Sequence, residues 1–288
     1  MIALRVRHQT TYRYRQPVVL GPHRLMLRPR ESRDVRVISN EVVVTPSGAV
    51  TWAQDVFGNA VATVAFTQMC DVLMIEATTD IQLHATAWPV FDIAASAIVY
   101  PFRYSDEEWT DLGALTVQNH HDPNARLAQW ARGFVRGVTT DTLALLKDLS
   151  SGVSKWIRYQ SREDEGAQSP VETLERGWGS CRDFAVLFVE AARSLGFGAR
   201  IVSGYLFSPD DSLAGNSRAG TTHAWAEVFV SGAGWISFDP TNQAVGGFNL
   251  IPVGVGRDIG QIMPVAGSFV GGGGAFQGLT VEVRVEST

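Results

Sequence analysis

Residues 177–205 read GWGSCRDFAVLFVEAARSLGFGARIVSGY, and this stretch contains one of the two cysteines of the chain. Ser180 and Asp183 have the spacing of a capping box, and Gly196 stands where a helix C-terminal cap belongs. The pattern therefore predicts a helix that begins near Ser180, with Cys181 in its first turn, and a strand over residues 199–207. The apolar residues between the two caps recur at helical spacing: Phe184, Leu187, Phe188, Ala191, Ala192 and Leu195.

A cysteine in the first turn of a helix has two interpretations. The positive end of a helix favours the thiolate over a thiol whose pKa is ordinarily about 8.5. The alternative is a small, buried, apolar side chain, which is the usual state of a lone cysteine. Residues 221–230, TTHAWAEVFV, alternate like a strand with His223 near its start, and residues 234–242, GWISFDPTN, contain Asp239. Cys181, His223 and Asp239 would supply a nucleophile, a base and an orienting group, so we favour the reactive interpretation.

Three blocks of the chain resemble the bacterial family of transglutaminase-like cysteine proteases. They are GAQSPVETLERG at 166–177, GWGSCRDFAVLFVEAARSLGFGARIVSGYL at 177–206, and THAWAEVFVSGAGWISFDPTN at 222–242. The resemblance extends over the full length, including the HxTxYxY run at 8–14 and GRDIGQIMPVAGSFVGG at 256–272. It implies a papain-like core with Cys181 as nucleophile, His223 as base and Asp239 as orienting group, behind a β-rich N-terminal domain.

The organisation along the chain predicts an α+β fold. Residues 1–95 read as short strands separated by turns, such as Gly58-Asn59, and we expect an N-terminal β-sandwich. Residues 96–124 read as a connector. Residues 125–288 are predicted to form a papain-like or transglutaminase-like catalytic core of helices packed on an antiparallel sheet, with a C-terminal tail strand. Helices are expected near 127–135, 142–157 and 169–177.

The two strands that carry the base and the acid pose a problem of register. A tight hairpin through residues 231–234 would pair Val230 with Trp235, and therefore Ala226 with Asp239. His223 would then lie three residues away from Asp239 and on the opposite face. A triad in that register needs a bulge or a bend near one strand end.

Attack on an amide carbonyl generates an oxyanion that needs hydrogen-bond donors. The backbone N–H of Cys181 at the helix start is one candidate. The side chains of Gln168 and Trp178 are the others. Gln168 can contribute only if the helix over 169–177 folds back toward Cys181.

These residues predict a thiol-dependent acyl hydrolase, a cysteine peptidase or amidase, that acts on a peptide or protein amide through a thioester. A transglutaminase or other acyltransferase with an amine acceptor is the alternative, because the same triad serves both and the fold does not choose between them. A non-catalytic peptide-binding scaffold is a further alternative. Residues 208–220 are polar and glycine-rich, so a lid built from them would exclude water poorly, which favours hydrolysis.

Composition bounds the partners and cofactors. Residues 1–40 hold nine arginines, but several alternate with apolar residues as on a solvated strand face, and no groove-reading motif accompanies them. We therefore expect no nucleic-acid partner. No apolar run approaches the length of a membrane span and the N-terminus lacks a signal-peptide pattern, so the expected location is the cytoplasm.

The cysteines and histidines give no metal or disulfide signature. Cys70 and Cys181 are too few for a disulfide framework or a zinc site, and Cys70 lies in a β-rich run where we expect a core residue. His120, His121 and Asp122 are adjacent and are expected to form a solvated loop. We predict no metal and no cofactor.

Overall fold

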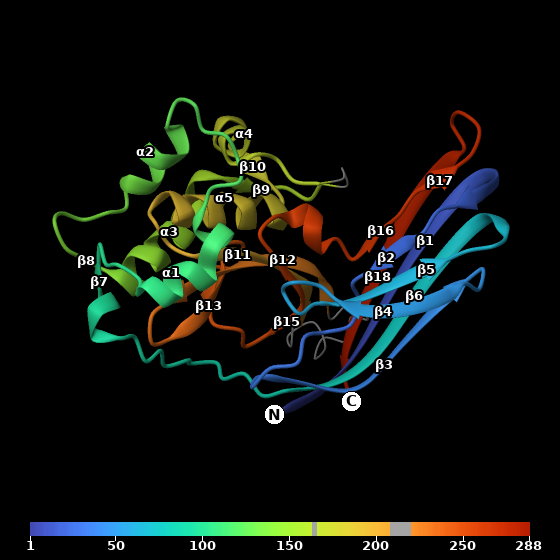
Figure 1. Ribbon diagram of the computed structural model, residues 1–288, viewed down its shortest axis with the longest axis horizontal. Coiled ribbons are helices and arrows are strands. Elements are labelled where there is room, and N and C mark those ends of the chain that lie inside the picture. The colour runs from blue at the N-terminus through green and yellow to red at the C-terminus, as the bar shows by residue number, and fades with distance from the viewer. Residues whose placement is uncertain (163–165, 208–219) are drawn as a thin grey trace.

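In a computed structural model, residues 1–162, 166–207 and 220–288 are described, and they form a β-rich region on one side and a helical region on the other (Figure 1). The β-rich region holds two antiparallel sheets. One sheet contains β1 (Ile2–Leu20), β6 (Met69–Leu83) and β3 (Val35–Thr45), in that spatial order. The other contains β2 (His23–Leu25), β5 (Ala60–Ala65) and β4 (Ala49–Gln54), in that order.

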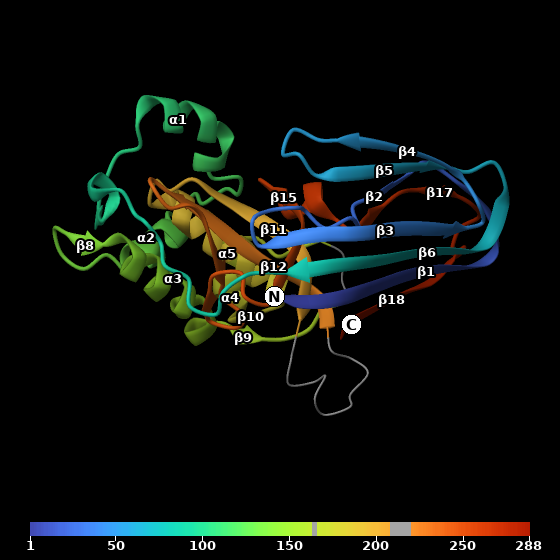
Figure 2. The ribbon, with the colours of Figure 1, turned by 90° about the horizontal axis from the view of Figure 1, so that it is seen from below.

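The two sheets lie one above the other (Figure 2). Their facing side chains form one apolar cluster, to which β2 contributes Leu25, β5 contributes Val64, and β6 contributes Leu73 and Ile75. Burial alternates along β6, as expected of a strand with one face on a core. The turn at Gly58-Asn59 joins β4 to β5, as predicted from the sequence.

The end of the chain returns to this region. β18 (Phe276–Ser287) and β17 (Phe269–Val270) both pair antiparallel with β1, and β16 (Val265–Ala266) pairs with β2. The tail strand therefore belongs to the N-terminal sheet, whereas the sequence grouped it with the catalytic core. Alternation along residues 279–285 predicts a strand but does not identify the strand that pairs with it. In the structure that partner is β1, which pairs with β6 on one edge and with β18 on the other.

The second region is built on a five-stranded antiparallel sheet with the order β14-β13-β12-β11-β15. Val285 of β18 is fully buried in the same apolar cluster as Val228 of β12, so the two regions share a core. The strands of the sheet are β11 (Ala199–Phe207), β12 (Gly220–Val230), β13 (Gly234–Asp239), β14 (Ala244–Val245) and β15 (Leu250–Gly256).

Helix α5 (Cys181–Ser194) is the central element of this region. It packs on β11 and β12 and is contacted by α2, α3 and α4, so that every residue from Asp183 to Arg193 is buried. The sequence predicted this helix, its neighbours and β11 closely. The other helices are α1 (Asp106–Leu112), α2 (Arg126–Arg132), α3 (Thr142–Trp156) and α4 (Pro170–Arg176). Short elements complete the chain: 3-10 turns at Ala95–Ala97, Gly113–Thr116 and Ile259–Ile262, the pair β7 (Val99–Tyr100) and β8 (Thr140–Asp141), and the pair β9 (Arg158–Tyr159) and β10 (Trp178–Gly179).

The predicted connector is structured. It contains α1, whose capping box joins Ser105 and Glu108, a signal present in the sequence SDEE. Its end is held to α5 through buried Glu190, whose Oε2 accepts the backbone N–H groups of Asn119 (2.8 Å) and His120 (2.9 Å). Glu190 in turn pairs with buried Arg193 at 2.6 Å.

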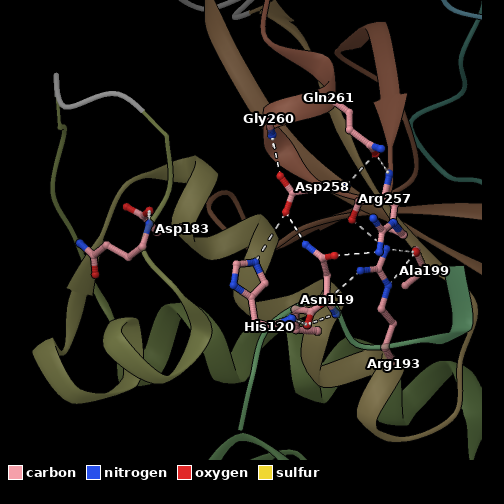
Figure 3. Close-up of polar contacts among 11 residues, drawn as sticks. Asn119, His120, Asp183, Arg193, Ala199, Arg257, Asp258, Gly260 and Gln261 are labelled. Atoms are coloured by element: carbon pink, nitrogen blue, oxygen red, sulfur yellow. Dashed lines mark hydrogen bonds and ion pairs between the residues drawn. The ribbon is translucent and has the colours of Figure 1, made fainter. Parts of the chain in front are cut away.

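A polar cluster extends this attachment to the 3-10 turn after β15. Asn119 Nδ2 donates to Asp258 at 2.6 Å, and Arg193 donates to the carbonyl of Ala199 (Figure 3). Asp122, in the loop predicted at residues 120–122, accepts the N–H of Arg126 at the start of α2 at 2.8 Å. Within the described part of the chain, no group of three or more His, Cys, Asp or Glu side chains is arranged to hold a metal ion.

Among the helices of residues 1–162, 166–207 and 220–288, none has both the length and the apolar character that a membrane span requires.

Candidate active site

Cys181 is the first residue of α5 and is half-buried. Gly177, in the left-handed conformation with φ 68°, ends α4, and the short strand β10 then leads into the new helix. The Asp183 carboxylate accepts hydrogen bonds from the backbone N–H (2.7 Å) and the hydroxyl (2.9 Å) of Ser180. The predicted capping pair is therefore formed, and it fixes the first turn that carries Cys181.

His223 and Asp239 meet across the hairpin of β12 and β13. Nε2 of His223 lies 2.8 Å from Oδ2 of Asp239, and both side chains are buried. The observed register pairs Val230 with Gly234 and Ala226 with Phe238. That register differs by one residue from the predicted one, and a one-residue shift moves a side chain to the other face. The two side chains thus share a face, and no bulge is needed.

The reason for the shifted register is the turn. The loop has three residues, 231–233, rather than the four predicted. Gly232 and Gly234 adopt positive φ values of 86° and 74°, which residues with a side chain rarely adopt. Two glycines so placed allow the shorter loop, but their presence in the sequence does not choose between loop lengths.

Asp239 is held from several sides. Its Oδ1 accepts the backbone N–H groups of Thr241 (3.0 Å) and Asn242 (3.2 Å), and its Oδ2 accepts Nδ2 of Asn242 at 2.7 Å. Burial acts to raise the pKa of Asp239, but the hydrogen bonds to His223 and Asn242 outweigh it and hold the pKa below its usual range. Asn242 was not predicted as a site residue. The sequence feature that could have identified Asn242 is its position in DPTN, because an amide side chain three residues after an aspartate can hydrogen-bond to it across a turn.

His223 links this carboxylate to the thiol. Burial acts to lower its pKa, but hydrogen bonds to Asp239 and Cys181 outweigh burial and raise the pKa to about 9. The ionised Asp239 can only accept, so Nε2 of His223 carries the shared proton and Nδ1 is left for the sulfur. The structure thus brings the three predicted residues together: His223 is hydrogen-bonded to Asp239 and lies close enough to Cys181 for the thiol to act on its pKa.

Gln168 lies beside the start of α5. Its backbone N–H donates to Oδ1 of Asp183 at 2.7 Å, and its side chain is 3% exposed. Neither end of its side-chain amide has a hydrogen-bond partner among the described residues. Trp178 is half-buried in β10, with the guanidinium of Arg176 at 5.4 Å from its ring centroid.

Tyr159 is a neighbour of the thiol that sequence reasoning missed. It pairs with Gly179 in the short parallel ladder of β9 and β10, and its ring packs edge-on against Phe184, one turn after Cys181. Burial is the main cause that raises the pKa of the Tyr159 phenol, and the nearby Cys181 adds to it. No motif in the sequence distinguished this tyrosine from the others.

Comparison with known proteins agrees with this architecture. A protein of Mycobacterium leprae, uncharacterized, is 26% identical over 98% of this chain and 99% of its own. An uncharacterized protein of Mycobacterium tuberculosis is 27% identical over 91% of this chain and 86% of its own. The crystal structure of a candidate cysteine protease from Cytophaga hutchinsonii has the same fold, with a TM-score of 0.76 and 18% identity over 100% of this chain and 91% of that one.

Family models match both regions. Residues 4–82 match the bacterial transglutaminase-like N-terminal region, and residues 128–240, which contain Cys181, His223 and Asp239, match the transglutaminase-like superfamily. The chain therefore belongs to the transglutaminase-like superfamily and carries a bacterial transglutaminase-like N-terminal region.

Proposed function

We propose that this protein is a thiol-dependent acyl hydrolase in which Cys181 is the nucleophile, His223 the general base and acid, and Asp239 the orienting group. The observation that carries the proposal is the 2.8 Å hydrogen bond between His223 and Asp239, in a pair close enough to the Cys181 thiol for it to act on the pKa of His223. A non-catalytic scaffold has no need of this arrangement. A scaffold would be expected to lose the thiol or the imidazole, and this chain keeps both.

The reaction follows from this arrangement. His223 takes the proton of the Cys181 thiol, and the sulfur attacks the carbonyl carbon of a peptide or protein amide, moving the C=O electron pair to oxygen. When the tetrahedral intermediate collapses, the C–N bond breaks and His223 returns the proton to the departing amine. The product is a thioester on Cys181. Asp239 fixes the tautomer and ring plane of His223 throughout.

The oxyanion needs donors close to the sulfur. The first intrahelical bond at the start of α5 runs from the N–H of Phe184 to the carbonyl of Ser180, so the N–H of Cys181 has no partner within the helix. We propose that this group and the side-chain amide of Gln168 bind the oxyanion. That amide is buried and has no hydrogen-bond partner among the described residues, which supports the assignment and favours Gln168 over Trp178.

Water is the proposed acceptor of the acyl group, and an amine acceptor, as in a transglutaminase, is the second candidate. The residues before His223 are polar and glycine-rich, which favours access of water; residues 208–219 lie outside the described part of the structure. Hydrolysis then repeats the chemistry, with His223 deprotonating water, the C–S bond breaking and the thiol re-forming.

A partition experiment tests the proposal. Wild-type protein and Cys181→Ala are mixed with p-nitrophenyl acetate or a glutamine-containing peptide library, with increasing methylamine. The hydrolase reading predicts acylation of wild type only and free acid as the main product at millimolar amine. If the methylamide is the main product, the proposed hydrolase is wrong and the protein is an acyltransferase. Equal turnover by Cys181→Ala excludes the thiol mechanism altogether.

A further inference from the structure

We infer that Asp183 is a positioning residue, which holds the Gln168 side chain beside Cys181 as well as capping α5. The inference rests on the proposed function, because it deepens the account of the oxyanion site. A capping role alone would engage only Ser180. The structure shows that the same carboxylate also bonds to two groups outside the helix.

The four hydrogen bonds of Asp183 divide evenly between its two oxygens. Oδ2 accepts the backbone N–H (2.7 Å) and hydroxyl (2.9 Å) of Ser180. Oδ1 accepts the backbone N–H of Gln168 (2.7 Å) and the guanidinium of Arg162 (3.2 Å). The Asp183 side chain is fully buried. One carboxylate thus spans the short distance between the residue before the nucleophile and the segment that carries Gln168.

The surroundings are shaped around this carboxylate. Arg162 also donates to the carbonyl of Gly166 at 3.0 Å, two residues before Gln168. Gly179 leaves room for the carboxylate, because a Cβ atom there would come within 2.8 Å of the Asp183 Cβ. Donors from Arg162, from Gln168 and from Ser180 at the start of α5 therefore converge on one buried side chain.

The chemistry requires a carboxylate at this position. An ionised aspartate offers about four acceptor sites and no donor, which matches four incoming donors. An asparagine of the same shape would point its NH₂ group at two of them. The backbone N–H of Gln168 would then lose its anchor, and the Gln168 side chain has no hydrogen bond of its own among the described residues to replace it.

A double-mutant cycle tests the inference on the full chain. Wild type, Asp183→Asn, Gln168→Ala and the double variant are compared in two reactions of Cys181: acetylation by p-nitrophenyl acetate, which forms an oxyanion, and alkylation by iodoacetamide, which does not. Each single change should slow acetylation about a hundredfold, the lower end of the range for one lost oxyanion donor. Alkylation should change less than about threefold.

Coupling decides the outcome. If Asp183 acts through Gln168, adding Asp183→Asn to Gln168→Ala should slow acetylation by less than about threefold more. Multiplicative effects would overturn the inference, since a purely structural role gives independent losses. Glu190→Gln is the matched control, a buried carboxylate at the other end of α5, and its effect on acetylation of the folded protein should be small and independent of Gln168.

Two further results are decisive. If Asp183→Asn fails to fold, Arg162→Ala is used in its place, because it removes one donor to the same carboxylate. Its effect on acetylation should be smaller and should again be coupled to Gln168→Ala. Independent effects of these two substitutions would also overturn the inference. If wild type is neither acetylated nor alkylated at Cys181, the proposed function fails and the inference fails with it. If wild type reacts and only the coupling is absent, the proposed function survives.

Discussion

Nε2 of His223 lies 2.8 Å from Oδ2 of Asp239, although 16 residues separate the two positions in the chain. The contact exists because the hairpin pairs Ala226 with Phe238, which puts both side chains on one face of the sheet. Asp239 and Cys181 together raise the pKa of His223 against the effect of burial. The contact between the base and the acid therefore depends on the register of two strands.

Asp239→Asn should keep the fold but lose most turnover. Without the carboxylate the imidazole loses its preferred tautomer, a change that costs about 10⁴ in the serine-protease case. The basic limb of the pH–rate profile, expected near the His223 pKa of about 9, should also move to lower pH. Steady-state rates from pH 5 to 10, with the melting temperature as a check on folding, measure both effects. An unchanged rate in a folded variant would remove Asp239 from the mechanism.

The two cysteines should differ in reactivity. Burial and the nearby Asp71 raise the pKa of the half-buried Cys70 thiol, so it should react slowly with iodoacetamide at neutral pH. Cys181, which lies beside His223 at the start of α5, should be labelled already at pH 6. Peptide mapping after timed alkylation, with Cys70→Ala and Cys181→Ala as matched controls, separates the two sites. Labelling of both cysteines only above pH 8.5 would show that the Cys181 thiol does not pass its proton to His223.

His8 should make the protein sensitive to acid. It is buried where β1 meets β11, with Nδ1 at 3.1 Å from the Tyr205 hydroxyl and Nε2 at 2.9 Å from Thr10 Oγ1. Burial lowers its pKa to about 4. The unfolded chain protonates first, so stability should fall as pH drops from about 6.5 toward 4, by roughly 3 kcal/mol in total, and level off below.

Urea unfolding of wild type and His8→Gln at a series of pH values checks this expectation. The variant should lose that part of the pH dependence even if it is less stable overall. His223 acts with the opposite sign, because its raised pKa gives stability that is present below about pH 6.5 and lost as pH rises through about 9. Parallel pH profiles for wild type and His8→Gln below pH 6.5 would exclude His8 as the source.

Asn242→Ala should weaken the site without unfolding the protein. Its side chain supplies the hydrogen bond to Oδ2 of Asp239, the oxygen that also faces His223. We expect turnover to fall about tenfold, the scale of one hydrogen bond to a charged group, with little change in KM. Thr241→Val is the matched control, since Thr241 contacts Asp239 only through its backbone N–H. Equal losses in both variants would point to general disruption of the turn.

A fragment of residues 97–288 should aggregate. In the intact chain β18 pairs with β1, and Val285 is fully buried against the shared core. Removal of β1 leaves a strand with an unpaired edge and an uncovered apolar face. Size-exclusion chromatography and acetylation of Cys181 measure the result. A monomeric fragment with full activity would show that the N-terminal region is dispensable.

The sequence by itself determined the local elements around the nucleophile. Helical spacing of apolar residues and the Ser180–Asp183 pair predicted α5 with Cys181 in its first turn, and the observed helix begins at Cys181. The strand over residues 199–207 was predicted to the residue. These features depend on neighbours within a few positions, and local patterns encode such neighbours directly. The residue types and their order also pointed to His223 and Asp239.

Only the tertiary structure decided how those elements combine. The hairpin register that unites His223 with Asp239 depends on a loop of three residues rather than four, and the two glycines present permit either. Alternation in residues 279–285 predicted a strand, yet its partner β1 lies at the other end of the chain. The second role of Asp183, toward Gln168, required a contact across 15 positions. Such contacts depend on which surfaces meet when the chain folds. An amphipathic pattern predicts that one face of an element is buried, but it does not identify the element that covers that face.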